Sequence, residues 1–168
     1  MSARCGTVIP THSRQVILSA IRMWRLTSSF FLGIFVAAMF TNAVAVYLLH
    51  DVDADRIGQW NLAYWELAQE FLAFSTVAAI CFFLATWIGR VAFGLRDAPV
   101  NPKLGYVLGI ALTLIQYPAE FTVRKLAPAL ADVFLLGYVL LSPICCAAII
   151  LLNSRNRRHE LTGEITTS

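Results

Sequence analysis

The chain has 168 residues, of which 58% are hydrophobic and 14% are charged, and its formal net charge is +3. A soluble domain carries about a quarter of charged residues, and here the apolar residues stand in long runs, so the composition excludes an ordinary soluble core and predicts helices that cross a membrane. The basic residues lie mainly at the two ends and in one loop, where membrane topology places them, so we expect no nucleic-acid partner.

Residues 1–25 form a basic segment that is partly amphipathic. Its arginines are Arg4, Arg14, Arg22 and Arg25. Apolar residues recur within it at helical spacing: Val16, Ile17, Ala20, Ile21 and Trp24. Three interpretations are open: a short helix on the membrane surface, an inward extension of the first span, or a plain flank that sets the topology.

The first predicted span covers residues 26–49. Arg25, the apolar run to Phe40 and the sequence Ala43-Val44-Ala45 also fit a signal peptide with its cleavage site. Apolar residues continue past that sequence to Leu49, which favours a retained span. With either interpretation, the segment that follows is expected on the outer side of the membrane.

The loop at residues 50–70 is acidic, and Arg56 is its one Lys or Arg. Apolar residues at intervals of three and four predict an amphipathic helix near residues 56–70 that runs into the second span. Trp60, Tyr64 and Trp65 suit the headgroup layer. The loop begins like an EF-hand, but Arg56 stands where glycine is required and Leu62 where the bidentate glutamate is required, so we expect no metal site.

Further spans are predicted at residues 71–93, 104–123 and 133–152. Arg90, near the end of the second, is expected to extend to the interface. Residues 153–168 form a basic, then polar tail that we expect to be disordered. The predicted fold is therefore an all-α polytopic membrane protein: a bundle of four transmembrane helices at residues 26–152, with an outer interfacial amphipathic helix.

The distribution of Lys and Arg predicts the orientation. The N-terminal segment, the region from Arg90 to Lys103 and the C-terminal tail hold most of the basic residues, and cytoplasmic flanks are enriched in Lys and Arg. Both termini are expected in the cytoplasm of a bacterial cell, with the protein in its inner membrane. The loop with Arg124 and Lys125 is outside by parity, against this trend.

All four predicted spans carry polar side chains near the outer face. We list as candidate binding residues Asn42, Thr76, Gln116, Tyr117, Glu120, Asp132 and Tyr138. Polar groups within a bilayer are costly and are usually turned inward and paired. Two interpretations are open: a polar pocket that opens outward, or side chains that pair with one another near the headgroups.

Two features of the third span stand out. Glu120 precedes Arg124 by four residues, the favourable order for a helical salt bridge, and the alternative is a carboxylate that couples protons or cations. Gly105, Gly109 and Thr113 form a small-residue face that lets helices approach closely, either within the bundle or between protomers. Pro118 removes a backbone donor between these features and would free a carbonyl.

The sequence contains no pattern of a catalytic, metal or cofactor site. The histidines lie outside the predicted spans, Cys145-Cys146 suits apolar packing, and no nucleophile has an evident base. We therefore expect a non-enzymatic protein that binds a membrane-protein partner, a toxin or an assembly factor at the outer leaflet, or a second copy of itself. On layout alone, the chain resembles membrane-embedded immunity proteins against pore-forming toxins. The alternatives are a small oligomeric transporter that uses Glu120 and Gln116, and an intramembrane enzyme.

Overall fold

A computed structural model describes the backbone of residues 11–49, 57–96 and 98–166, in which the regular structure is helical. Its elements are α1 (Thr11–Leu49), α2 (Ile57–Ala92), α3 (Pro102–Leu126), the short 3-10 helix η3 (Pro128–Leu130) and α4 (Ala131–Thr166). Four stretches are long and apolar enough to cross a membrane: Val16–Val44, Phe71–Ala92, Pro102–Leu126 and Pro128–Arg158. The prediction of an all-α chain with four such stretches is confirmed.

The helices are longer than the predicted spans. The basic segment from Thr11 onward is continuous with the first span, and the helix expected near residues 56–70 is the beginning of α2. Disorder of the tail was the wrong expectation, because α4 continues to Thr166. Residues 153–162 contain neither proline nor glycine, so nothing in the sequence ends the helix there. The acidic residues of the 50–56 loop lie outside the described residues.

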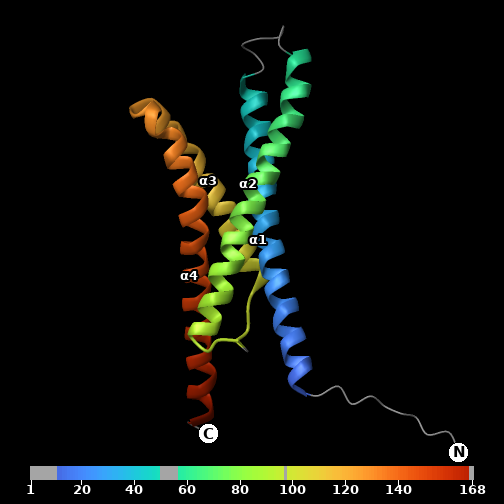
Figure 1. Cartoon of the computed structure of the whole chain (residues 1–168), viewed down its shortest axis with the longest axis vertical. Coiled ribbons are helices and arrows are strands. Elements are labelled where there is room, and N and C mark those ends of the chain that lie inside the picture. Colours follow the sequence, from blue (N-terminus) through green and yellow to red (C-terminus); the bar gives the residue numbers. More distant parts are fainter. Residues whose placement is uncertain (1–10, 50–56, 97, 167–168) are drawn as a thin grey trace, which may run out of the picture.

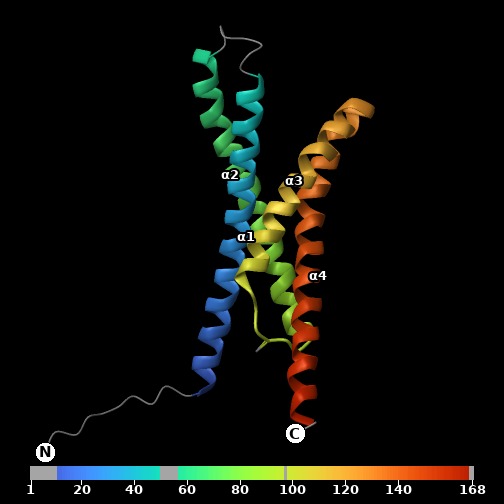
Figure 2. The same cartoon turned by 180° about the vertical axis from the view of Figure 1, so that it is seen from behind.

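The four long helices alternate in direction along the chain, and each packs mainly against the helix that runs the same way (Figure 1). α1 and α3 run in one direction and α2 and α4 in the other (Figure 1). α1 packs mainly against α3, and α2 mainly against α4. Toward the C-terminal ends of α1 and α3, the pair α1 and α2 diverges from the pair α3 and α4, which gives the molecule a V shape in both views (Figures 1 and 2).

An apolar core joins the four helices below the point where they diverge. Its fully buried residues include Leu26, Phe30 and Ile34 of α1, and Phe82 of α2. The rings of Phe30 and Phe82 are stacked with their centroids 4.1 Å apart. Such a ring pair adds about 1 kcal/mol beyond the area it buries. On the side of the α1 and α3 N-termini, the core therefore holds the diverging pairs, α1 with α2 and α3 with α4, together.

The small-residue face of α3 lies against α1. A Cβ atom added to Gly105 would lie 2.9 Å from the carbonyl oxygen of Leu26, and one added to Gly109 would lie 2.5 Å from that of Phe30. Thr113, one turn further on, is buried and donates its hydroxyl to the Gly109 carbonyl at 3.0 Å. The contact lies within one chain, so the two helices approach backbone to backbone without a second protomer.

Candidate functional site: a polar cavity where the helices diverge

A cavity of about 390 Å³ lies where α1 and α2 begin to separate from α3 and α4 (Figure 1). We call it the central cavity. It is lined by residues from each of the four long helices: Ala38, Asn42, Phe71, Phe74, Thr113, Gln116, Tyr117, Glu120, Arg124 and Leu135. Its walls are partly aromatic and partly polar, and its size is within the range of small-molecule sites.

One face of α3 supplies most of the polar wall. Thr113, Gln116, Tyr117, Glu120 and Arg124 follow one another at intervals of three, one, three and four residues, which places them on one side of a helix with 3.6 residues per turn. α1 places Asn42 on the same cavity. The structure thus brings together Asn42 and three α3 residues that the sequence indicated.

Two carboxamides face this cavity without a protein partner among the described residues. Gln116 is 9% exposed and forms no hydrogen bond with another described side chain or backbone group. The Nδ2 atom of Asn42 is buried and also lacks a described acceptor. A buried polar group left without a hydrogen bond costs about 1–3 kcal/mol. A carboxamide both donates and accepts, so these side chains suit a ligand that carries peptide-like polar groups, or water.

Glu120 and Arg124 form an ion pair at the rim of the cavity. The Nη2 and Nε atoms of Arg124 lie 2.8 and 2.9 Å from Oε1 of Glu120. The side chains are 21% exposed for Glu120 and 56% exposed for Arg124. A pair this open to solvent contributes about 1 kcal/mol or less to stability, so both charges remain accessible to a third group.

Tyr117 connects the cavity wall to α1. Its hydroxyl lies 3.5 Å from the carbonyl oxygen of Ala38, which is long for a hydrogen bond. The ring is half-buried between the helices. The phenol therefore keeps hydrogen-bonding capacity for a group that enters the cavity.

Three of the predicted site residues do not line the cavity. Thr76 is exposed and donates to the Leu72 carbonyl at 2.7 Å, and it lies about 200° around α2 from Phe74. Tyr138 donates to the Leu112 carbonyl at 2.7 Å, which uses its hydroxyl in packing α4 against α3. Asp132 is exposed in the first turn of α4. Depth alone placed these residues with the others, and rotation about the helix axes separates them.

The apolar core closes the cavity on one side. Leu112 directly precedes Thr113 on α3, and Ala78 lies one turn beyond Phe74 on α2; both belong to the core with Phe30 and Phe82. The polar wall therefore ends where the core begins. The arrangement can bind a ligand from the open end of the V, and it offers no polar route through the core cluster.

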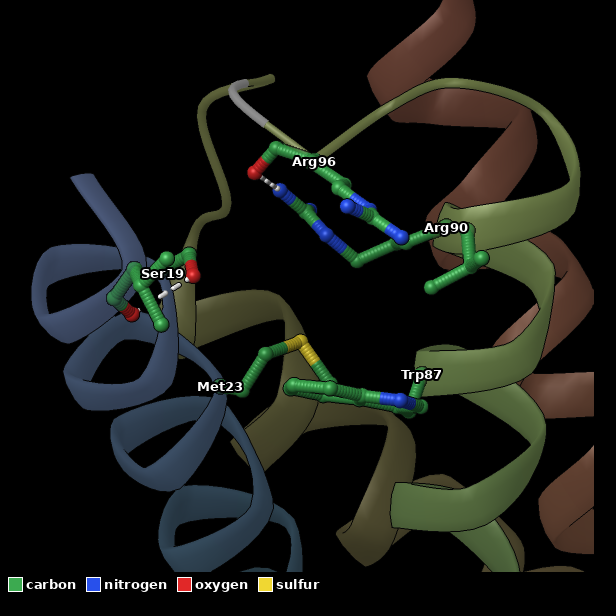
Figure 3. A pocket seen from close by; sticks show the side chains of 7 residues that line it. Ser19, Met23, Trp87, Arg90 and Arg96 are labelled. Atoms are coloured by element: carbon green, nitrogen blue, oxygen red, sulfur yellow. Dashed lines mark hydrogen bonds between the residues drawn. The ribbon is translucent and has the colours of Figure 1, made fainter. Parts of the chain in front are cut away.

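A buried arginine at the opposite end of the molecule was missed by the sequence analysis. Arg90 was expected to extend to the interface, but it is 4% exposed, and its Nη2 atom donates to the carbonyls of Arg96 and Ala98, both at 2.8 Å. Figure 3 shows this side chain reaching across a cavity of about 170 Å³ that Met23 and Trp87 also line. The feature of the sequence that could have indicated this burial is the position of Arg90, four residues before the glycine that follows the end of α2.

The chain reverses direction beside Arg90 through a glycine turn. Gly94 has a φ of 63°, and the amide of Leu95 donates to the carbonyl of Arg90 at 2.8 Å, which ends α2 as a left-handed glycine cap. From α4, Nη1 of Arg158 donates to the Gly94 carbonyl at 3.0 Å. The loop after α2 is therefore fixed by two arginines from two helices.

The described residues contain no group of three or more His, Cys, Asp or Glu that could hold a metal ion. A scan of protein-family models and searches of curated proteins and of solved structures find no match to the chain. The inference about function therefore rests on the geometry of the central cavity.

Proposed function

We propose that the chain is a four-span protein of a bacterial inner membrane that binds a partner in its central cavity and catalyses no reaction. α3 has 25 residues, which at about 1.5 Å per residue exceeds the ~30 Å of a hydrocarbon core. α3 also has charged residues near each end, with Lys103 in its first turn and Arg124 and Lys125 in its last. These features support insertion of the bundle in a bilayer.

The cavity faces outward in this proposal. The opposite end of the molecule carries Arg22 and Arg25 on α1, the loop with Arg96, and Arg155 and Arg158 on α4. Such a basic end belongs in the cytoplasm. The V then opens toward the outer leaflet, and a partner reaches Asn42 and Gln116 from outside or from within that leaflet.

The observation that carries the proposal is the pair of carboxamides, Asn42 and Gln116, which face the cavity without a described protein partner. Buried polar side chains usually find a partner, as the Tyr138 hydroxyl does at a backbone carbonyl of α3. Ser75 and Thr86 also lack a described partner, but they are fully buried and do not line the central cavity. The two carboxamides, in contrast, lie on the cavity wall. The partner we propose is a peptide segment of a membrane or periplasmic protein, because its backbone offers donors and acceptors together. An immunity or assembly factor would use such a site.

A small transporter is the second candidate, and the ion pair of Glu120 and Arg124 at the rim favours it. Transport requires a polar route to the cytoplasmic side. The core around Phe30, Phe82 and Leu112 is apolar and closely packed at that level. We therefore favour partner binding over transport as the function.

Photo-crosslinking in intact cells tests the proposal. A diazirine analogue of leucine at position 135 lies on the cavity wall, and the same analogue at the neighbouring position 136, which is 62% exposed, lies outside it. We expect a protein adduct from position 135 alone. Gln116→Leu should weaken that adduct by about fivefold or more, as the loss of one buried hydrogen bond predicts. Equal adducts from both positions would contradict a partner in the cavity.

A further inference from the structure

A long apolar groove runs along the α1 and α2 pair, away from the central cavity. Two adjoining hollows, of about 490 and 440 Å³, share Trp24 and Phe83 in their walls, so they form one continuous surface. We call it the α1–α2 groove. Small residues such as Ser28 and Ala79 lie along it, and aromatic rings line it, with Phe83 and Trp87 stacked at 5.9 Å.

The length of the groove matches one leaflet of a bilayer. On α1 it extends from Ala20 to Phe31 and on α2 from Thr76 to Trp87, which is twelve residues, or eleven residue-to-residue steps, on each helix. At about 1.5 Å per step this is about 16 Å, close to half of the ~30 Å hydrocarbon core. A partner helix that crossed the membrane would need a contact surface over the whole height. An acyl chain needs only one leaflet.

The end of the groove near the N-terminus of α1 is basic and aromatic. Arg25 lines it beside Trp24 and Trp87, which are 71% and 43% exposed. Trp87 also borders the small cavity that Arg90 and Arg96 line (Figure 3). Among the residues that the structure describes, no acidic side chain lines either hollow. Guanidinium groups pair well with phosphate, and indole rings suit the headgroup layer.

We propose that the α1–α2 groove binds one anionic phospholipid from the cytoplasmic leaflet. An acyl chain lies between the helices as far as Phe31 and Thr76, and the phosphate contacts Arg25, with Arg96 adding to the positive field. The inference rests on the membrane insertion proposed above, and it is independent of the central cavity. A zwitterionic lipid fits the apolar groove equally well but is attracted less strongly by two guanidinium groups.

Quenching of tryptophan fluorescence by brominated lipids tests this assignment. The full chain with Trp60→Phe and Trp65→Phe retains only Trp24 and Trp87, which both line the groove. It is reconstituted in phosphatidylcholine vesicles with equal mole fractions of brominated phosphatidylglycerol or brominated phosphatidylcholine. We expect the affinity of the quenching site for phosphatidylglycerol to be at least about fivefold higher than for phosphatidylcholine. Arg25→Gln should lower this ratio by about fivefold.

Matched variants separate the groove from general surface charge. Arg155→Gln removes an exposed arginine that does not line the groove and should leave the preference unchanged. Ser28→Phe fills the groove and should reduce quenching by both lipids, whereas Leu114→Phe on the exposed face of α3 should not. Equal quenching by the two lipids in the parent protein would overturn the proposal. So would quenching that falls as protein is concentrated in the vesicles, because a second copy would then cover the groove.

Discussion

Gly33 of α1 and Gly109 of α3 face each other in a close backbone contact between the two helices. A Cβ atom added to Gly109 would lie 3.2 Å from the Cα of Gly33, and one added to Gly33 would lie 3.3 Å from the Cα of Gly109. Neither position has room for a side chain, because the atoms it would meet include backbone atoms that cannot rotate away. This contact sets the spacing of α1 and α3, and therefore the position of Asn42 relative to Gln116.

We predict that Gly109→Ala destabilises the protein by about 1–3 kcal/mol, the usual cost of overpacking. The added methyl group would lie 2.5 Å from the carbonyl oxygen of Phe30 and 3.0 Å from the amide nitrogen of Ile34. Gly137→Ala on α4 is the matched control, since nothing lies within 4 Å of its added Cβ. The control should be neutral or slightly stabilising, because alanine favours the helix. Equal thermal unfolding temperatures for the two variants in detergent would contradict this role of Gly109.

We predict that Arg90→Met destabilises the loop after α2. The change leaves the carbonyls of Arg96 and Ala98 without the guanidinium that now donates to both, at a cost of about 2–3 kcal/mol for bonds to a charged donor. Arg96→Met is the control, because it removes an exposed side chain and keeps the carbonyl that Arg90 uses. Limited proteolysis within residues 94–101 should accelerate in the first variant alone. Identical cleavage rates would show that Arg90 does not hold the loop.

The sequence predicted the four long apolar stretches well and the rotation of each helix about its axis poorly. Hydropathy located the four apolar stretches because each is a long run, and the spacing of Gly105 and Gly109 marked a face for close packing. Asn42, Gln116 and Thr76 were grouped because their positions within the predicted spans gave them the same expected depth. Whether a side chain faces the cavity or the surface depends on how each helix is turned against its neighbours, which a single sequence with weak amphipathicity does not determine. Burial of Arg90 depends likewise on the path of a loop.

We predict that Glu120→Gln changes stability by about 1 kcal/mol or less, because its ion pair with Arg124 is partly exposed. The same variant should lose the adduct from the photoreactive leucine at position 135, since the amide keeps the shape of the rim and removes its charge. Asp132→Asn is the control: it removes an exposed carboxylate that does not line the cavity and should keep the adduct. An adduct that survives Glu120→Gln would remove Glu120 from the binding surface.

The orientation is tested by reporter fusions. A reporter after Ser168 or after Val100 should report the cytoplasm, and one inserted within residues 52–59 should report the outside, because the Lys and Arg residues are concentrated at the ends predicted to be cytoplasmic. Alkaline phosphatase and a fluorescent protein report opposite sides of the membrane. Each of the three positions is tested with both reporters, so that the two signals control one another. An external C-terminus would be incompatible with four spans and a cytoplasmic N-terminus.

Binding of a partner in the central cavity requires that the cavity be hydrated and open to the outside, and thiol labelling measures this directly. In a chain with Cys5, Cys81, Cys145 and Cys146 changed to Ala, single cysteines are placed at Asn42 and Gln116 in the cavity and at Thr76 and Ile115 on the exposed surface outside it. A charged, membrane-impermeant maleimide is added to intact spheroplasts. We expect labelling at positions 42 and 116, with protection at positions 76 and 115, where lipid covers the thiol. Protection at all four positions would contradict an open, hydrated cavity, because the polar layer would then be dry packing between helices.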